Sequence, residues 1–323
     1  MSKRILIIIS IISLLTNSCQ RKERDAKDID KISGTITISG AWALYPMAIK
    51  WAEEYRKICP AVKIDISAGG AGKGMADALA GVVDLGMVSR DIYPDEIKKR
   101  AWWVSVTKDA VVPTINENNP FLDVLLRKGV PREILIDIWI TGKITNWEEV
   151  VNQKGELKTD TKINVYTRSD ACGAAETWAK FLGKNQEDLL GIGVFGDPGL
   201  AEAVRKDVLG IGYNNINYAY DTSAKSQIKG LRVLPIDLNG NGEIDEEENF
   251  YTTRDDITKA IEEGKYPSPP ARDLHFVCKG KPRKKIVINF IKWVLTDGQL
   301  YVSESGYINL RKAKLKEELS KID

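Results

Sequence analysis

A glycine-rich turn inside a strand–turn–helix–strand unit constrains this chain more than any other feature. The unit runs from residue 64 to residue 91, and its turn, residues 67–75, reads Ser-Ala-Gly-Gly-Ala-Gly-Lys-Gly-Met. A helix start leaves several amide groups without intrahelical partners and carries partial positive charge. Because Gly70 and Gly72 have no side chains, an anion can approach those amides closely. The turn therefore predicts an oxyanion site, and a flexible surface turn is the alternative.

The same turn does not match the two common nucleotide-binding motifs. A phosphate-binding loop of the Walker type needs Ser or Thr after Lys73, but Gly74 stands there. A dinucleotide-binding turn needs glycine at the position that Met75 occupies. The sequence therefore argues against nucleotide binding.

The first residues predict export. Lys3 and Arg4 precede an apolar run over residues 5–15, which is about half of the roughly 20 residues that a membrane-spanning helix needs. We expect a signal peptide over residues 1–18, a lipidated N-terminus at Cys19 and a charged tether over residues 19–31. The expected location is the periplasm or the outer face of the cell membrane, where a lipid holds the protein. Ordinary cleavage to a soluble exported protein is the alternative.

The charge balance excludes one class of partner. Without Lys3 and Arg4, the chain has as many basic residues as its 45 acidic ones, and opposite charges alternate along its solvated segments. A nucleic-acid-binding protein would instead carry a basic patch and an excess of lysine and arginine. We expect no nucleic-acid partner and a monomer.

The order of elements predicts an α/β fold with two lobes, each a mainly parallel sheet flanked by helices. Repeated strand-then-helix order favours parallel sheets, and 323 residues suffice for two cores. We expect lobe 1 to comprise residues 32–113 and 222–323, and lobe 2 residues 114–221. Strand-to-helix turns at residues 39–41, 69–74 and 170–175 would then converge on a cleft between the lobes, because ligands of such sheets bind at the carboxyl ends of the strands.

The catalytic equipment for an enzyme is sparse. His275 is the only histidine, and it lies in an apolar segment that is typical of a buried strand. Cys172 stands at a predicted helix start, where its pKa should fall. No base accompanies it, so a small core residue is favoured over a nucleophile. We therefore expect no enzymatic activity; the alternatives are a hydrolase of phosphate or sulfate esters that uses Cys172 or Asp170, and a sensory or scaffold protein.

Several segments together resemble a known family, the type II substrate-binding proteins of ABC importers, and within it the phosphate-binding branch. The similar segments cover nearly the whole chain after the tether: residues 38–46, 68–72, 83–90, 168–174, 266–267, Arg272 and 293–306. The resemblance implies a small anionic solute as ligand and a membrane permease as partner. It also implies a ligand site made of Ser39, Gly40, Ala41, Trp42, Gly70, Ala71, Gly72, Ser89, Arg90, Arg168, Asp170, Cys172, Gly173 and Ala174. Arg168 can hold two oxygens with its planar fork, and a salt bridge to Asp170 is the alternative role.

The chain also departs from the family at its hydroxyl donors. Where the phosphate binders place hydroxyl groups, this chain has Ala41, Ala71, Cys172 and Ala174. Each lost hydrogen bond to a charged ligand costs roughly 1.5 to 3 kcal/mol unless another donor replaces it. We therefore expect an altered preference, for a larger or less protic oxyanion or an anionic organic solute, with Trp42 as an apolar wall.

A second site is independent of the first. Residues 237–248 read Asp-Leu-Asn-Gly-Asn-Gly-Glu-Ile-Asp-Glu-Glu-Glu and match the twelve-residue calcium loop, with Gly242 at position six and Ile244 at position eight. The preceding residues 231–236 favour a strand, so a structural site is expected rather than a paired sensor. The expected cofactor is a structural Ca²⁺ ion, and its ligands are Asp237, Asn239, Asn241, Glu243, Asp245 and Glu248.

Overall fold

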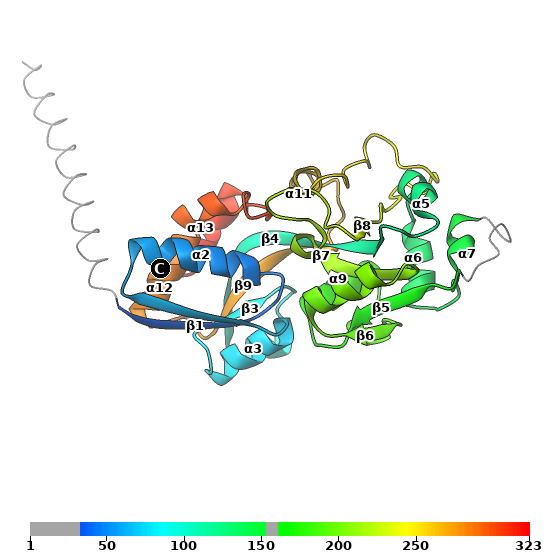
Figure 1. Cartoon of the computed structure of the whole chain (residues 1–323). Helices are drawn as coiled ribbons and strands as arrows, with labels where there is room; N and C mark the ends of the chain where they lie inside the picture. Colours follow the sequence, from blue (N-terminus) through cyan, green and yellow to red (C-terminus); the bar gives the residue numbers. More distant parts are fainter. Residues whose placement is uncertain (1–32, 153–160) are drawn as a thin grey trace, which may run out of the picture.

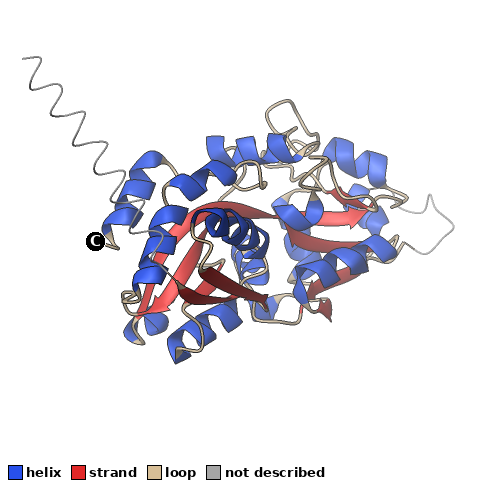
Figure 2. Ribbon diagram, turned by 60° about the vertical axis from the view of Figure 1, so that its left-hand side comes forward, coloured by secondary structure: helices blue, strands red, loops and turns tan. Residues whose placement is uncertain are grey.

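The computed structural model describes residues 33–152 and 161–323. The expected signal peptide, Cys19 and the tether lie outside the described residues. Two lobes lie side by side, and helices cover both faces of their strands (Figures 1 and 2). The α/β class and the two-lobed architecture are confirmed. The strands follow one another in the order β2-β1-β3-β9-β4-β7-β5-β6, with β8 paired to β4.

Lobe 1 contains the glycine-rich turn. Strands β1 and β2 are parallel, as are β1 and β3, whereas β9 runs antiparallel to β3. Helices α2 and α12 cover one face of this sheet and α3 covers the other (Figure 1). The bounds are β1 Gly34–Gly40, α2 Tyr45–Ile58, β2 Val62–Ala68, α3 Ala71–Ala80, β3 Leu85–Val88, α4 Pro94–Lys98, β9 Ala271–Lys279, α12 Lys285–Val294, η2 Asp297–Tyr301 and α13 Lys312–Ser320.

Lobe 2 repeats the pattern around the parallel strands β5, β6 and β7. Its core includes Trp139, Trp178 and Tyr213, whose rings pack against one another. The bounds are α5 Leu122–Lys128, α6 Arg132–Trp139, α7 Trp147–Val151, β5 Asn164–Arg168, α8 Gly173–Phe181, η1 Gln186–Asp188, β6 Ile192–Val194, α9 Gly196–Lys206, β7 Gly210–Asn215, α10 Ile216–Ala219, β8 Leu231–Val233 and α11 Arg254–Glu263.

One long strand, β4 (Ala101–Asn116), connects the lobes. Its residues 101–110 pair with β9 in lobe 1, and its residues 111–115 pair with β7 in lobe 2. The chain therefore passes between the lobes near Ala110, and it returns near Ala271, where β9 begins. The boundary near residue 113 was expected from the apolar sequence of this segment.

The return of the chain differs from the expectation. We expected residues 222–270 in lobe 1, but β8 pairs with the lobe 2 half of β4. Leu234, Tyr251 and Ile257 belong to the lobe 2 core. They share this buried cluster with residues of β4 and β7, so lobe 2 extends over residues 111–270.

Glycines determine how closely α3 packs on its sheet. A Cβ atom on Gly74 would overlap the carbonyl oxygen of Met87, and one on Gly86 would overlap the carbonyl oxygen of Gly74. Gly40, with φ 131°, lies against the same two residues, Met87 and Gly74. The N-terminal part of α3 therefore lies in direct backbone contact with the ends of β1 and β3.

No helix in residues 33–152 and 161–323 is long and apolar enough to cross a membrane.

Candidate functional site between the lobes

The turns selected from the sequence meet at the lobe interface. Gly70 and Gly72 of lobe 1 lie against Asp170 and Ala171 of lobe 2, and the Gly72 amide donates to the Ala171 carbonyl at 3.0 Å. Gly173, at the start of α8, lies so close to Ser89 that a Cβ atom there would overlap it. The Trp42 ring lies beside Gly196 at the start of α9, where a Cβ atom would be 3.3 Å from the ring. The structure thus brings the predicted segments together.

Several of the predicted amides already have partners within the protein. The Gly69 and Gly70 amides both donate to the Gly40 carbonyl, at 2.9 and 3.1 Å. The Ala41 amide donates to the Met87 carbonyl at 2.9 Å, and the Cys172 amide donates to Gln186 Oε1 at 3.2 Å. The expectation that these turns present free amides is wrong for these residues. The two lobes are in contact here, and glycines such as Gly70 and Gly72 allow the backbone of lobe 1 to approach the backbone of lobe 2 closely.

Arg168 is buried and fully engaged by two carboxylates. Its Nε and Nη2 atoms donate to Asp170 at 2.8 and 2.6 Å, and its Nη1 atom donates to Asp197 at 2.5 Å. Burial alone would lower the pKa of Arg168, but Asp197 and Asp170 outweigh burial and raise it. The side chain expected to hold the anion is therefore neutralised by protein carboxylates.

A chain of buried polar groups continues from Arg168 to the strands that connect the lobes. Asn215 Nδ2 donates to Asp197 Oδ1 at 2.6 Å, and Asn215 Oδ1 accepts from Arg272 Nη2. Arg272 Nη2 lies 3.8 Å from Asp109 Oδ2. Arg272 is on β9 and Asp109 is on β4, so this interlobe polar chain (Arg168, Asp170, Asp197, Asn215, Arg272 and Asp109) ends where the chain passes between the lobes.

At the Arg272 and Asp109 end of the interlobe polar chain, several polar atoms lack hydrogen-bond partners. Arg272 Nε, Arg272 Nη1 and Asp109 Oδ2 are buried and lack hydrogen-bond partners, as does Trp42 Nε1. Burial raises the pKa of Asp109 to about 7, against the opposing effect of Arg272. Burial also lowers the pKa of Arg272, and Asp109 and Asp197 offset part of that effect. Buried donors without partners are rare in proteins and indicate a site for water, an ion or a ligand.

Other predicted ligand residues are engaged elsewhere. The Ser39 hydroxyl donates to Asp77 Oδ2 at 2.7 Å, within lobe 1. Arg90 forms two hydrogen bonds to Glu96, at 3.0 and 2.7 Å, and its guanidinium lies over the Tyr93 ring. Ala71 and Ala174 are buried and offer only main-chain groups.

The thiol and the imidazole are both unsuited to nucleophilic catalysis. The Cys172 Sγ atom accepts the Ala175 amide at 3.4 Å and so caps α8. Burial raises the pKa of Cys172 to about 12, so the expectation of a lowered pKa is wrong, because desolvation outweighs the helix start and Arg168. His275 lies in β9, as expected, with Nδ1 3.1 Å from the Ser105 hydroxyl oxygen, and burial lowers its pKa to about 4. A neutral thiol and a neutral imidazole in separate lobes do not form a catalytic pair.

A pocket of about 760 Å³ opens between the lobes beside the interlobe polar chain. Arg90 and Tyr93 line it from lobe 1, and Glu176 and Lys180 line it from lobe 2. Arg272 also lines it, so the pocket leads to the buried guanidinium. Lys180 forms an ion pair with Asp91 across its mouth.

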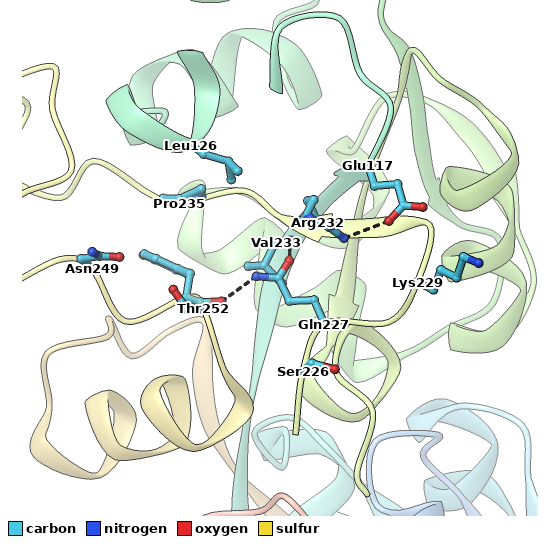
Figure 3. Close-up of a pocket in the computed structure, with 11 residues that line it drawn as sticks. Glu117, Leu126, Ser226, Gln227, Lys229, Arg232, Val233, Pro235, Asn249 and Thr252 are labelled. Atoms are coloured by element: carbon cyan, nitrogen blue, oxygen red, sulfur yellow. Dashed lines mark hydrogen bonds and ion pairs between the residues drawn. The ribbon is translucent and has the colours of Figure 1, made fainter. Parts of the chain in front are cut away.

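A second pocket, of about 560 Å³, lies in lobe 2 and away from the lobe interface (Figure 3). Arg232 and Glu117 form an ion pair in it at 3.1 Å, and the Gln227 side chain bonds to Val233 and Tyr251. None of the described residues that line it has a buried side-chain nitrogen or oxygen without a hydrogen-bond partner, so this pocket gives no sign of a ligand.

Sequence reasoning did not select Asp109, Asp197 or Asn215. Asp197 follows Gly196 in a fourth strand-to-helix turn, between β6 and α9, and the criterion that selected the other three turns applies to it as well. Asp109 is a single acidic residue at the edge of an apolar strand segment, which is itself a signal of a buried charge with a partner. Asn215 carries no comparable signal.

The three cysteines of residues 33–152 and 161–323 form no disulfide with one another. Cys59, Cys172 and Cys278 are buried and unpaired there. In the same residues, no three acidic, histidine or cysteine side chains are grouped so that they could hold a metal ion by themselves.

Sequence comparisons relate this chain to known binding proteins. Residues 26–298 match the model of a PBP superfamily domain. The phosphate-binding protein PstS of Xylella fastidiosa is 26% identical over 306 residues, which cover 85% of this chain and 82% of the relative. PstS of Staphylococcus epidermidis is 24% identical over 315 residues, which cover 95% of this chain and 88% of that protein.

Solved structures show the same fold. A protein from Clostridium perfringens, described as a phosphate ABC transporter substrate-binding protein with bound phosphate, superposes with a TM-score of 0.69 at 23% identity, covering 86% of this chain and 100% of that one. An ABC-type phosphate transport receptor from Vibrio cholerae gives 0.59 at 20% identity, covering 85% of this chain and 100% of that one. The chain therefore belongs to the PBP superfamily, and its resemblance to the phosphate-binding branch of the ABC-importer binding proteins is confirmed.

Proposed function

We propose that this protein is the solute-binding component of an ABC importer, which captures an oxyanion between its two lobes and delivers it to a membrane permease. Its relatives are named as phosphate-binding proteins, which supports an anionic solute. The observation that carries the proposal is the Arg272 guanidinium, buried at the lobe interface with Nε and Nη1 unpartnered.

The unpartnered donors favour an anion over a neutral solute. A guanidinium removed from water without hydrogen-bond partners is costly, and an oxyanion can accept two parallel hydrogen bonds from it. Trp42 Nε1 is a further buried donor at this interface. Protonation of Asp109, whose pKa is about 7, would leave the positive charge of Arg272 uncompensated and so strengthen anion binding.

We also propose that the preferred solute differs from inorganic phosphate. Arg168 is neutralised by Asp170 and Asp197, and the Ser39 hydroxyl is engaged by Asp77. Ala41, Ala71 and Ala174 add no side-chain donors. A larger or less protic oxyanion, or an anionic organic solute, relies less on hydroxyl groups, and the Trp42 ring offers it an apolar surface.

Lipid anchoring through Cys19 is part of the proposal, although it concerns residues outside the described structure. A tethered protein stays near the membrane in which its permease lies. Growth of the expressing cells with labelled palmitate should label the wild type and not Cys19→Ala. Label in Cys19→Ala, or none in either protein, contradicts the anchor.

Calorimetric titration tests the binding function directly. Phosphate, sulfate, molybdate and tungstate are titrated into the purified protein at pH 6 and pH 8. We expect heat from at least one anion, tighter binding at pH 6 for sulfate, which keeps its charge, and a loss of at least about tenfold in affinity in Arg272→Lys, which retains the charge but not the planar fork. The control Arg283→Lys changes an exposed arginine and should bind as the wild type does.

The outcomes separate the parts of this proposal. Submicromolar binding of phosphate alone contradicts the altered preference, and no heat from any of the anions contradicts anion capture. A sensory or scaffold role is the second candidate, which the internally satisfied amides favour. Small-angle scattering that shows no change of lobe separation upon anion binding supports that candidate over transport.

A further inference from the structure

Residues 237–248 form a loop in lobe 2, between β8 and α11, that takes no part in the solute site. In Figure 1 this yellow segment lies near α5, on the side of lobe 2 opposite β6. The Ile244 amide donates to the Arg127 carbonyl at 2.8 Å, and the Ile244 side chain packs against Gly129. The Asp237 amide donates to the Val130 carbonyl at 3.2 Å. The loop is therefore fixed to the turn that follows α5.

Both ends of the loop continue into the lobe 2 core. Ile236 and Tyr251 are buried, and the Ile236 amide donates to the Tyr251 hydroxyl at 3.2 Å. No helix follows the loop directly, since α11 begins at Arg254, so the unit is not a helix–loop–helix pair. Gly242 has φ 82°, which agrees with the sharp turn expected at position six.

The first residue of the loop holds a buried carboxylate. Asp237 is 4% exposed, its Oδ1 atom accepts the Gly240 amide at 2.7 Å, and its Oδ2 atom accepts the Gly242 amide at 2.9 Å. These bonds fold the loop around the carboxylate, and they bring only uncharged partners to it.

The last residue of the loop points back to the same place. Glu248 is 5% exposed, and its Oε1 atom accepts the amides of Leu238 and Asn239, which directly follow Asp237, at 2.9 and 3.0 Å. Its Oε2 atom is buried and has no hydrogen-bond partner. A buried carboxylate oxygen without a partner, next to a second buried carboxylate, is strongly unfavourable unless a cation binds there.

We propose that this loop binds a Ca²⁺ ion and that the ion ties the segment between β8 and α11 to the α5 end of lobe 2. The ligand set consists of oxygens from Asp237, Asn239, Asn241, Glu243, Asp245 and Glu248, with Glu243 at position seven contributing its main-chain carbonyl. Two amides and a carbonyl make up half of this set, and the residue at position nine, Asp245, often binds through a water molecule in such loops, so only the carboxylates of Asp237 and Glu248 need to reach the ion directly. Oxygen ligands alone favour calcium over zinc or copper, and a flexible set of six favours it over magnesium.

Calcium titration of the chelator-treated full chain tests the proposal. We expect saturable binding of one ion, a melting temperature higher by about 5 °C at a calcium concentration a hundredfold above Kd, and little effect of magnesium at that concentration. Glu248→Gln should weaken calcium binding by more than about tenfold, because it removes a bidentate ligand charge. Glu247→Gln removes the same charge from an exposed position and should bind as the wild type does.

A gain-of-affinity variant keeps the test independent of folding defects. Asn241→Asp adds a carboxylate at position five, where the residue is exposed, and should bind calcium more tightly than the wild type. Absence of a calcium-dependent melting shift in the wild type contradicts the site. So does equal affinity of Glu248→Gln and Glu247→Gln. Both results are independent of anion binding, so they do not bear on the proposed transport function.

Discussion

At the scale of single residues, the capacity of the lobe interface to bind an anion depends on which buried charged groups already have partners within the protein. Arg168 has two carboxylates, whereas Arg272 keeps Nε and Nη1 without partners. A sequence shows that arginine and aspartate two positions apart can pair, and the contact of Arg168 with Asp170 was one of the two roles weighed for it. It does not show that Asp197, 29 positions further along, occupies the remaining nitrogen, because that contact depends on how β5 and α9 pack.

Asp109 should make the stability of the protein depend on pH. Its folded-state pKa of about 7 exceeds the ordinary value of 3.8, so the folded protein binds the proton more tightly than the unfolded chain does. This contribution to stability is fully present below pH 4 and is lost as the pH rises towards 7. The free energy of unfolding falls by at most about 4 kcal/mol through this effect, since a pKa difference of one corresponds to about 1.4 kcal/mol.

Urea unfolding between pH 5 and pH 8 measures this contribution. Asp109→Asn cannot ionise and should lose less stability over this range than the wild type does. The exposed Asp95→Asn serves as control, with the pH dependence of the wild type. Parallel curves for wild type and Asp109→Asn would show that Asp109 is already ionised at pH 5.

At the scale of elements, the local sequence predicted the glycine-rich turn. The role of its glycines depends on how α3 packs against strands that lie elsewhere in the sequence. Residues 62–80 form strand, turn and helix, as the glycines and the apolar periodicity indicated. The sequence could not show that Gly74 and Gly86 face each other, because that requires the register of β1 and β3 against α3. Likewise, residues 231–236 read as a strand that was expected in lobe 1, and only the pairing of β8 with β4 assigns it to lobe 2.

Two glycines of α3, Gly72 and Gly74, should respond differently to replacement by alanine. Gly74→Ala places a methyl group against the Met87 carbonyl within lobe 1, so it should lower the free energy of unfolding by about 1 to 3 kcal/mol, despite the better helix propensity of alanine. Gly72→Ala instead meets Ala171 of the other lobe and should leave the unfolding of lobe 1 nearly unchanged. Urea titrations followed by tryptophan fluorescence measure both. Equal destabilisation by the two variants contradicts this division of roles.

At the scale of the whole molecule, β4 and β9 are the only described segments at which the chain passes between the lobes. All other described contacts across the interface join a segment of one lobe to a segment of the other without a chain connection. The paired strands near Ala110 and Ala271 therefore permit the lobes to open while each core stays intact. Sequence patterns predicted two lobes and a boundary within the segment of β4, but not the pairing of that strand with β9, because the two strands are far apart in the sequence and pair antiparallel.

Lobe opening can be forced at Gly173, where α8 meets lobe 1. A methyl group at this position overlaps the Ser89 carbonyl and hydroxyl oxygens, while Gly173 itself needs no unusual backbone conformation. Gly173→Ala should therefore separate the lobes without unfolding either of them. We expect a larger radius of gyration in small-angle scattering, a nearly unchanged melting temperature, and weaker binding of any anion that the wild type binds. A folded variant with an unchanged radius would mean that the Ser89 backbone moves aside more easily than the hinge opens, and the contact at Gly173 would then have no part in holding the lobes closed.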